Sequence, residues 1–447
     1  MDFEYLKKLA LDTAREAGIE DIEIYYSASE EISVETVGGK QSSFSTAESS
    51  GICVRVTSGG RLGYAASQVM TEDEMKRLVI RAKENAAVTE KEDTVGIYSG
   101  GEEYEAVGNG AISVSGAEEL KSSALGLSEC LFAASPLVRE GSATSAFSAR
   151  MTVRLANSRG VDCCAVGGVS ALSAEAVVEK DGSYENAYDT QRLSGELDPN
   201  EMAARLVAVA EKKIGAKSVP SGKYDIIIDG KRMRSLLSAF SSVFSAKNAQ
   251  MGLSLLAGKE GQTVASEVLT LTDDPAREGA SLKTCFDAEG VPAKRKAVIE
   301  KGVLKTLLHN RETALKAGIK TTANASKAGY AAPISVSPYA LCIEAGEYSS
   351  EELVALLGEG LLVTEIKGLH AGVNAISGDF SLEAAGFAVR EGRVCEAVRS
   401  FTVAGNFFEL LHSVSALANE VQLGISGSFT TFGAPDTLIK GVSVAGE

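Results

Sequence analysis

The hydrophobic residues near the amino terminus follow first a helical and then a strand-like spacing. Four apolar residues share one helical face, and a glycine after them predicts the end of the helix: Phe3, Leu6, Ala10, Ala14 and Gly18. Residues 22–26 and 32–37 then have strand character. Residues 51–57 and 61–66 flank a Ser-Gly-Gly turn, which predicts a hairpin. A capping box at Thr71 predicts a second helix, so this segment is typical of an α/β unit.

A polar, glycine-rich run at residues 96–110 predicts a boundary, and a second α/β unit follows it. A capping box at Ser115–Glu118 predicts a helix, and strands are expected within residues 144–178 with a break at Gly168. Asp198, which a proline follows, predicts the start of another helix.

The rest of the chain is richer in strands that glycines interrupt. After a second boundary at residues 219–222, the apolar run 224–228 predicts a buried strand, and a helix is expected over residues 231–252. Residues 298–304 predict a hairpin, and Ser349 is expected to cap a short helix.

These patterns predict an α+β fold in which two smaller α/β units precede a large β-rich domain. The expected domains are an N-terminal α/β domain over residues 1–110, a central α/β domain over 111–220 and a C-terminal β-rich domain over 221–447.

Composition narrows the classes of function. The chain has 447 residues, 45% hydrophobic and 23% charged, with a net charge of −16. Since an acidic surface repels phosphate backbones, we expect no direct contact with nucleic acid. The longest uncharged stretch, residues 328–343, is short and contains two prolines, so no membrane segment is expected. Seven scattered cysteines without a Cys-x-x-Cys pattern are expected to be reduced thiols in a cytoplasmic protein.

Reactive side chains are few. The three histidines, His309, His370 and His412, include no pair three to five residues apart, so no local pair of zinc ligands is present. We expect His309 to be a surface or hydrogen-bonded structural residue and His412 to pack on a helix. His370 lies in a glycine-flanked turn close in sequence to Asp379, which leaves a role in a site open.

Two other patterns are more typical of structural roles. Residues 424–428 contain Gly-x-Ser-Gly, which differs from the Gly-x-Ser-x-Gly of a nucleophile elbow and favours a loop. Asp225 and Asp229 stand on the same face of a predicted strand, about 13 Å apart at roughly 3.3 Å per residue, too far to share one ion. We therefore expect Asp229 to cap the following helix.

The segment at residues 360–399 carries a resemblance to a known family. Its core, residues 378–387, reads Gly-Asp-Phe-Ser-Leu-Glu-Ala-Ala-Gly-Phe, and the runs at 51–56, 286–292 and 402–406 match the same family in order. On these motifs the chain resembles the TldD/PmbA family, the so-called modulators of DNA gyrase, over nearly its whole length.

The resemblance implies a particular branch of that family. In the catalytic member a His-Glu-x-x-x-His helix and a cysteine in a late Gly-x-Cys-Gly turn form a zinc site. The equivalent positions here hold no zinc ligand: Ser238, Ala239, Val243 and Ser426. The chain is therefore similar to the metal-free PmbA/TldE-like branch, with no catalytic residue, no cofactor of its own and zinc expected in a TldD-like partner.

For that branch the resemblance implies a heterodimer with a TldD-like metallopeptidase subunit that degrades or trims unstructured peptides. Residues that could contact such a peptide are expected in the glycine-flanked turn and the family core: His370, Asn374, Gly378, Asp379 and Phe380. Two alternatives stay open, an autonomous peptidase with a site not visible in the sequence and a homodimeric peptide-binding or regulatory protein.

Overall fold

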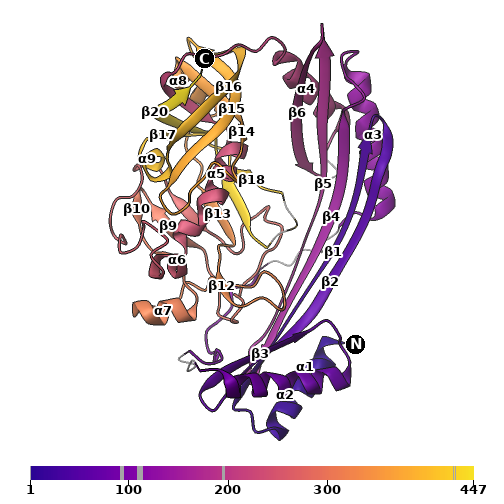
Figure 1. Ribbon diagram of the computed structural model, residues 1–447, viewed down its shortest axis with the longest axis vertical. Helices are drawn as coiled ribbons and strands as arrows, with labels where there is room; N and C mark the ends of the chain where they lie inside the picture. Colours follow the sequence, from indigo (N-terminus) through magenta and orange to yellow (C-terminus); the bar gives the residue numbers. More distant parts are fainter. Residues whose placement is uncertain are drawn as a thin grey trace.

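The structure is a computed structural model in which a long curved sheet stands beside a compact β-rich unit (Figure 1). It describes residues 2–90, 95–107, 114–193, 197–425, 427 and 429–446.

The long sheet has six antiparallel strands in the order β3-β2-β1-β4-β5-β6. Their bounds are Asp21–Val37 (β1), Lys40–Ser58 (β2), Arg61–Ser67 (β3), Ala143–Asn157 (β4), Asp162–Lys180 (β5) and Ser183–Arg192 (β6). β1 pairs with β4 from Glu23 opposite Asn157 to Val37 opposite Ala143. The two α/β segments predicted from the sequence thus contribute three strands each to a single sheet.

Four helices cover one face of this sheet. They are Phe3–Glu16 (α1), Glu72–Val88 (α2), Ala117–Ala134 (α3) and Pro199–Lys212 (α4). Since successive side chains of a strand point to opposite faces, the even-numbered residues of β1 face the helices. Ile22 and Ile24 pack with α1 and α2 at one end of the sheet, and Val34 packs with α3 and α4 at the other (Figure 1).

The capping residues predicted at the starts of the helices covering this sheet are found in the structure, with one exception. Thr71 and Asp198 cap α2 and α4 as predicted, each accepting a hydrogen bond from a first-turn backbone N–H. The capping box predicted at Ser115 is wrong, because α3 begins after Gly116 and the Ser115 N–H donates to Ser170 Oγ instead.

The strand break predicted at Gly168 is also wrong, since β5 runs through it without interruption. A Cβ atom on the neighbouring Gly167 would lie 2.5 Å from the backbone oxygen of Ser281. The Gly168 N–H donates to that same oxygen. The glycines therefore mark the place where a C-terminal segment contacts the sheet, not the end of a strand.

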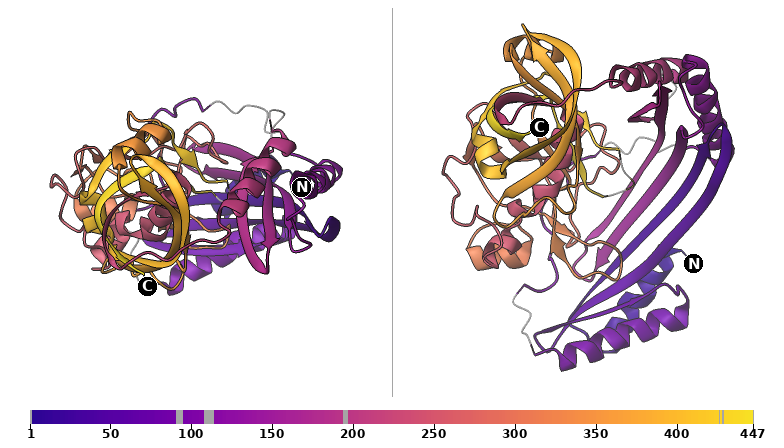
Figure 2. Two further views of the ribbon diagram at one scale, coloured as in Figure 1. Left: turned by 90° about the horizontal axis from the view of Figure 1, so that it is seen from above. Right: turned by 45° about the horizontal axis from the view of Figure 1, so that its top comes forward.

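The C-terminal unit contains a sheet that closes on itself. Its order is β16-β15-β14-β7-β20-β17, and β16 also pairs with β20, so five strands form a ring that Figure 2 shows end-on. The bounds are Gly222–Ile228 (β7), Gly360–Lys367 (β14), Asp379–Arg390 (β15), Arg393–Asn406 (β16), Val414–Leu417 (β17) and Thr437–Ala445 (β20).

A second sheet has the order β10-β9-β8-β13-β19-β18, and β11 pairs with β12 beside it. The bounds are Leu271–Asp273 (β8), Lys296–Glu300 (β9), Val303–Leu304 (β10), Ala325–Ser326 (β11), Ser335–Val336 (β12), Ala340–Ile343 (β13), Gln422–Leu423 (β18) and Thr431–Ala434 (β19). The C-terminal helices are Gly230–Phe240 (α5), Ala246–Gln250 (α6), Arg311–Ala317 (α7), Ser350–Leu357 (α8) and Phe407–His412 (α9).

The single helix predicted over residues 231–252 is wrong, because α5 ends at Phe240 and a 3-10 turn, Ser241–Phe244, precedes α6. Ser245 has extended backbone, and the next N–H donates to the backbone oxygen of Leu308, which turns the chain away from the helix axis. Asp229 caps α5 as expected, accepting from the Arg232 N–H. The predicted α+β class is confirmed, and in the described part of the chain no helix is long and apolar enough to cross a membrane.

Candidate functional site

The face of the long sheet opposite its helices packs, at one end, against the C-terminal unit. There Glu23 of β1 lies directly opposite Arg55 of β2, and Tyr25 lies opposite Cys53. All four side chains are buried. Arg55 Nη2 donates to Glu23 Oε2 at 2.8 Å, so a charged pair sits inside the protein at this junction.

A loop of the C-terminal unit, residues 286–292, meets this pair. Asp287 accepts hydrogen bonds from the backbone N–H groups of Glu289, Val291 and Ala325. Glu289 accepts from the Arg311 N–H at 2.9 Å, and its other carboxylate oxygen lies 3.8 Å from Arg55 Nη1. Asp287 thereby holds the loop to its own domain, and Glu289 links that domain to the sheet.

Burial dominates the electrostatics of the two carboxyl groups. It raises the pKa of Asp287 well above its usual range, and the charge of Glu289 raises it further. Burial also raises the pKa of Glu289, against the opposing effect of the Arg55 guanidinium. The site therefore contains carboxyl groups that hold a proton more readily than exposed ones.

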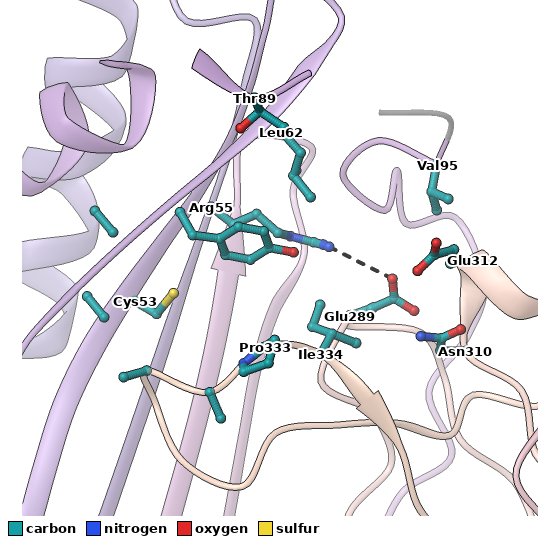
Figure 3. A pocket seen from close by; sticks show the side chains of 15 residues that line it. Cys53, Arg55, Leu62, Thr89, Val95, Glu289, Asn310, Glu312, Pro333 and Ile334 are labelled. Carbon is teal, nitrogen blue, oxygen red and sulfur yellow. Dashed lines mark ion pairs between the residues drawn. The ribbon is translucent and has the colours of Figure 1, made fainter. Parts of the chain in front are cut away.

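A cavity of about 600 Å³ opens beside this junction (Figure 3). Its polar lining comes from Arg55, Glu289 and Asn310, whose side chains point toward one another in Figure 3, together with Glu312. Its apolar lining comes from β3 and from the loop after β11: Leu62, Ala65, Ala66, Ala331, Ala332, Pro333 and Ile334. A cavity of this size, with mostly apolar walls and a few convergent polar groups, has the character of a ligand pocket.

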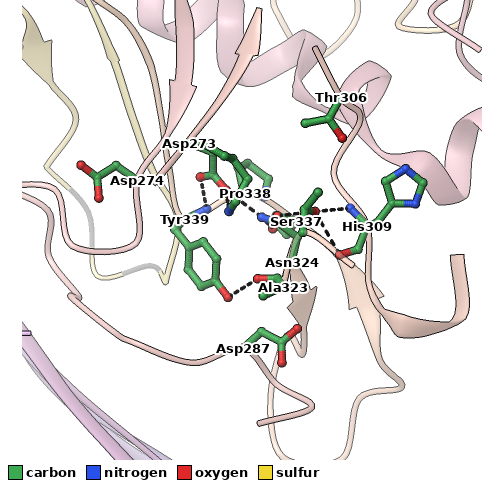
Figure 4. A network of polar contacts seen from close by, with 12 residues as sticks. Asp273, Asp274, Asp287, Thr306, His309, Ala323, Asn324, Ser337, Pro338 and Tyr339 are labelled. Carbon is green, nitrogen blue, oxygen red and sulfur yellow. Dashed lines mark hydrogen bonds and ion pairs between the residues drawn. The ribbon is translucent and has the colours of Figure 1, made fainter. Parts of the chain in front are cut away.

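A second polar network lies deeper in the C-terminal unit (Figure 4). Asp273 is fully buried and accepts from the Tyr339 N–H and from Asn324 Nδ2, each at 2.7 Å. Lys296 Nζ lies 3.2 Å from the same carboxylate. The Tyr339 hydroxyl donates to the Ala323 backbone oxygen. These groups satisfy one another's hydrogen-bonding capacity, so we assign the network a structural role in supporting the strands around it.

His309 borders that network (Figure 4) and is only 3% exposed. Of the two alternatives predicted for it from the sequence, the surface location is therefore wrong. Its Nδ1 has no hydrogen-bond partner in the described part of the chain. Burial lowers the pKa of this imidazole. The charge of Glu260 opposes this effect of burial on the pKa, but among the described residues no carboxylate forms a hydrogen bond with the ring, as it would with a general base.

The five residues predicted to contact a peptide lie together, in the turn before β15 and at the start of that strand. His370 and Asp379 are exposed, and the Asp379 carboxylate accepts from Asn406 Nδ2 at 3.0 Å. The Asn374 side chain accepts from two backbone N–H groups of its own turn. Gly378 has a φ of 84°, and Phe380 is buried in the core.

These contacts give the turn a defined shape, and none of the five residues lines the cavity of Figure 3. A role in peptide binding stays a prediction for His370, Asn374, Gly378, Asp379 and Phe380.

The positions equivalent to the zinc-binding helix lie at the end of α5 and in the turn that follows it. Ser238 and Ala239 are partly buried on α5, and Val243 is fully buried. Ser426 lies outside the described residues. A hydroxyl, a methyl and an isopropyl group do not provide the imidazole or thiolate that zinc requires. Among the residues that the structure describes, no three His, Cys, Asp or Glu side chains are grouped so that they could hold a metal ion.

Neither Arg55 nor Glu289 is predicted as a site residue from the sequence. A signal was present, since Arg55 is the only charge in the otherwise buried run Ile52–Thr57. A charge inside such a run indicates a buried partner. Its nearer partner, Glu23, lies on the adjacent strand, whereas the second partner, Glu289, comes from a segment more than two hundred residues away, which spacing alone does not reveal.

Known domain families match three segments of the chain. Residues 22–86 match the PmbA/TldA metallopeptidase domain 1, residues 112–214 the central domain and residues 221–446 the C-terminal domain of the same description. The third match alone covers just over half of the chain.

Among curated proteins, a metalloprotease of Methanothermobacter thermautotrophicus is 32% identical over 51% of this chain and 50% of its own length. A metalloprotease of Archaeoglobus fulgidus is 32% identical over 50% of this chain and 52% of its own length. The chain thus aligns with about half the length of these two relatives. An uncharacterised protein of Methanocaldococcus jannaschii is 27% identical over 95% of this chain and 96% of its own.

Solved structures share the whole fold. A Thermotoga maritima protein described as a candidate modulator of a DNA gyrase superposes with a TM-score of 0.89 at 29% identity, covering 99% of this chain and 100% of that one. TldE of Thermococcus kodakarensis superposes with a TM-score of 0.83 at 24% identity, covering 98% and 99%, which shows a common fold. On the three domain matches and this fold, the chain belongs to the TldD/PmbA family of metallopeptidase-like proteins.

Proposed function

We propose that this chain is the metal-free, PmbA/TldE-like subunit of a zinc metallopeptidase that degrades or trims unstructured peptides. A TldD-like subunit carries the zinc, and this chain has no catalytic residue of its own. The observation that supports this role is the set of side chains at the end of α5 and in the turn after it, where Ser238, Ala239 and Val243 replace the family's metal ligands and its water-activating glutamate.

The non-catalytic subunit helps to hold the peptide. Extended peptides commonly bind by adding a strand to a sheet, and the two open six-stranded sheets of this chain end in the edge strands β3 and β6 and the edge strands β10 and β18. The turn with His370 and Asn374 and the neighbouring Asp379 would supply polar contacts to a peptide, because their side chains are exposed.

Cytoplasmic location is part of the same proposal. All seven cysteines are free thiols, which is typical of a reducing compartment. The net charge of −16 supports a partner other than nucleic acid, so any link to gyrase would pass through peptides that act on it.

The test is co-expression of this chain with a TldD-like protein from the same organism, followed by metal analysis and cleavage of an unfolded peptide. We expect a stable mixed complex with zinc and activity, and no cleavage by this chain alone. Cleavage with stoichiometric zinc in the isolated chain would contradict the proposal and favour an autonomous peptidase. A chain that never co-purifies with the TldD-like protein would instead favour a binding or regulatory protein.

A further inference from the structure

The cavity of Figure 3 lies between the long sheet and the C-terminal unit and takes its walls from both. β2 and β3 provide one wall, and residues 331–334, in the loop between β11 and β12, provide another. Its volume of about 600 Å³ falls in the range of pockets that enclose a small organic molecule. The polar groups at one end, Arg55, Glu289 and Asn310, therefore decide which molecules it could bind.

Asn310 has hydrogen-bond donors that no described residue uses. The residue is only 3% exposed, and its Oδ1 accepts from the Thr313 N–H at 2.9 Å, which caps α7. This contact fixes the orientation of the side-chain amide. Its Nδ2 donates to no described residue, and in Figure 3 it points toward Glu289. Two N–H groups of a buried side chain are therefore directed into the cavity.

Glu289 and Arg55 also have hydrogen-bonding capacity left. Glu289 Oε2 accepts from the Arg311 N–H, whereas Oε1 lies 3.8 Å from Arg55 Nη1, which is beyond hydrogen-bond distance. The Arg55 side chain is 6% exposed, and its Nε has no partner among the described residues. Buried polar groups without partners cost free energy. A ligand that supplies both an acceptor and a donor at this end would remove part of that cost.

The charges around this polar end cancel. Among the described residues, four basic and four acidic side chains interact at or beside it: Arg55, Arg311, Lys316, Lys327, Glu23, Asp287, Glu289 and Glu312. Burial raises the pKa of Asp287 and lowers the pKa of Lys327, so the balance holds even where both are neutral. An ion bound here would lose its hydration shell without gaining a net counter-charge. The site therefore favours a neutral ligand.

We propose that this cavity binds a neutral small molecule with an apolar body and one amide group. The amide oxygen accepts from Asn310 Nδ2, and the amide N–H donates to Glu289 Oε1. The apolar body fills the space between β3 and residues 331–334, whose side chains provide most of the apolar wall. The proposal is independent of the peptidase role, because binding requires neither zinc nor a partner subunit.

The two charged analogues of an amide fit less well. A carboxylate has no hydrogen to donate to Glu289, and its charge repels that side chain. An ammonium group has no lone pair to accept from Asn310, so the Nδ2 N–H groups remain without a partner. A site built to pair with both groups discriminates against a ligand that lacks one of them.

The first test compares three probes that share an isopentyl body and differ in the head group: isocaproamide, isocaproate and isohexylamine. Each is titrated into the purified full chain at neutral pH, and binding is followed by ligand-observed NMR. We expect a dissociation constant of about 1 mM or lower for the amide. The two charged probes should bind at least about tenfold more weakly. N-acetyl-leucinamide adds the amide groups of a peptide unit: binding tighter than that of isocaproamide would identify the ligand as part of a peptide chain, and weaker binding as a free amide.

The second test places the probe in this cavity. Asn310→Asp keeps an oxygen that caps α7 but replaces the two N–H groups with a second acceptor. Isocaproamide should bind at least about tenfold more weakly to this variant, and isohexylamine should become the preferred probe. Asn200→Asp makes the same change at an exposed position on α4 and should leave the amide affinity unchanged. Ala66→Phe fills the cavity from β3 and should abolish binding of every probe.

A thermal melt shows whether each variant is folded. Equal binding of the three head groups, or no detectable binding of either amide, overturns the proposal. Unchanged affinity for isocaproamide in a folded Asn310→Asp or Ala66→Phe variant also overturns it. The comparison of head groups uses the parental chain, so it decides the proposal even where a variant does not fold.

Discussion

Arg55 of the long sheet and Glu289 of the C-terminal unit face each other across the junction between these two parts, 3.8 Å apart at their closest charged atoms. The same guanidinium pairs with Glu23 at 2.8 Å. One buried cation is thus shared between two buried carboxylates, one from each side of the junction. The sheet and the C-terminal unit are consequently coupled by charge as well as by apolar packing.

Replacing this cation should weaken the fold strongly. Arg55→Met leaves Glu23 and Glu289 buried without compensation, and we expect the free energy of unfolding to fall by about 3–5 kcal/mol. Urea denaturation of the full chain measures the change. Adding Glu23→Gln should recover part of the loss, because one buried charge disappears. Lys8→Met, at an exposed position on α1, should change stability by no more than about 0.5 kcal/mol. Equal effects at Arg55 and Lys8 would contradict the assigned role of Arg55.

A second prediction concerns the close approach of β5 to the C-terminal unit. A Cβ atom on Gly167 would lie 2.5 Å from the Ser281 backbone oxygen and 2.8 Å from Leu282 Cα, and neither is the end of a flexible side chain. Gly167→Ala should therefore destabilise the protein by about 1–3 kcal/mol. Gly126→Ala is the matched control, because nothing lies within 4 Å of its Cβ position on α3. This change should stabilise the protein by up to about 1 kcal/mol. A thermal melt that shifts both variants in the same direction would count against the predicted clash.

Local signals in the sequence located most of the secondary structure. The Gly-Gly turn between β2 and β3 closes a hairpin as predicted, with Ser58 opposite Arg61. Ser349 forms the predicted capping box with Glu352 on α8. These features depend on residues that are neighbours in sequence, so they can be predicted without knowledge of the fold.

The predictions that proved wrong concern places where a segment distant in the sequence determines the local conformation. Gly168 looked like a strand end, yet it accommodates Ser281 of the C-terminal unit. The helix expected to continue beyond Phe240 is interrupted where Leu308 binds the chain. Arg55 was not predicted as a site residue for the same reason, because the second carboxylate that pairs with its guanidinium comes from another domain. Tertiary contacts of this kind override local propensity and leave no periodic signal.

The third prediction is a pH dependence at the start of α5. Burial raises the pKa of the Asp229 carboxyl from an ordinary value of 3.8 to about 6. Between these values the unfolded chain releases a proton that the folded chain keeps, so this group's contribution to stability falls as pH rises from about 4 to about 6 and is constant above. Asp229→Asn keeps an oxygen that can cap Arg232 but cannot ionise.

We therefore expect the Asn variant to gain about 1–3 kcal/mol on the parent as pH rises over that window. Urea denaturation at pH 4, 5, 6 and 7 measures the difference. Asp198→Asn makes the same change at the exposed cap of α4 and controls for capping itself. A difference that is flat with pH, or that shrinks between pH 4 and 6, would show that Asp229 ionises as readily in the folded protein as in the unfolded chain.

The last prediction separates a metal-free subunit from a metalloprotein that has lost its ion. Ser238, Ala239 and Val243 offer zinc no ligand, so neither EDTA nor added zinc should move the melting temperature of the isolated chain. A real site would respond, because a ligand at a hundredfold excess over its dissociation constant stabilises the folded state by about 2.7 kcal/mol. Weak zinc binding by the exposed Cys164 and Cys395 is controlled by replacing both with serine. In the mixed complex, by contrast, EDTA should abolish peptide cleavage and zinc should restore it. A melting temperature that rises with zinc in the serine-substituted isolated chain would place a metal site in this chain and refute its metal-free role.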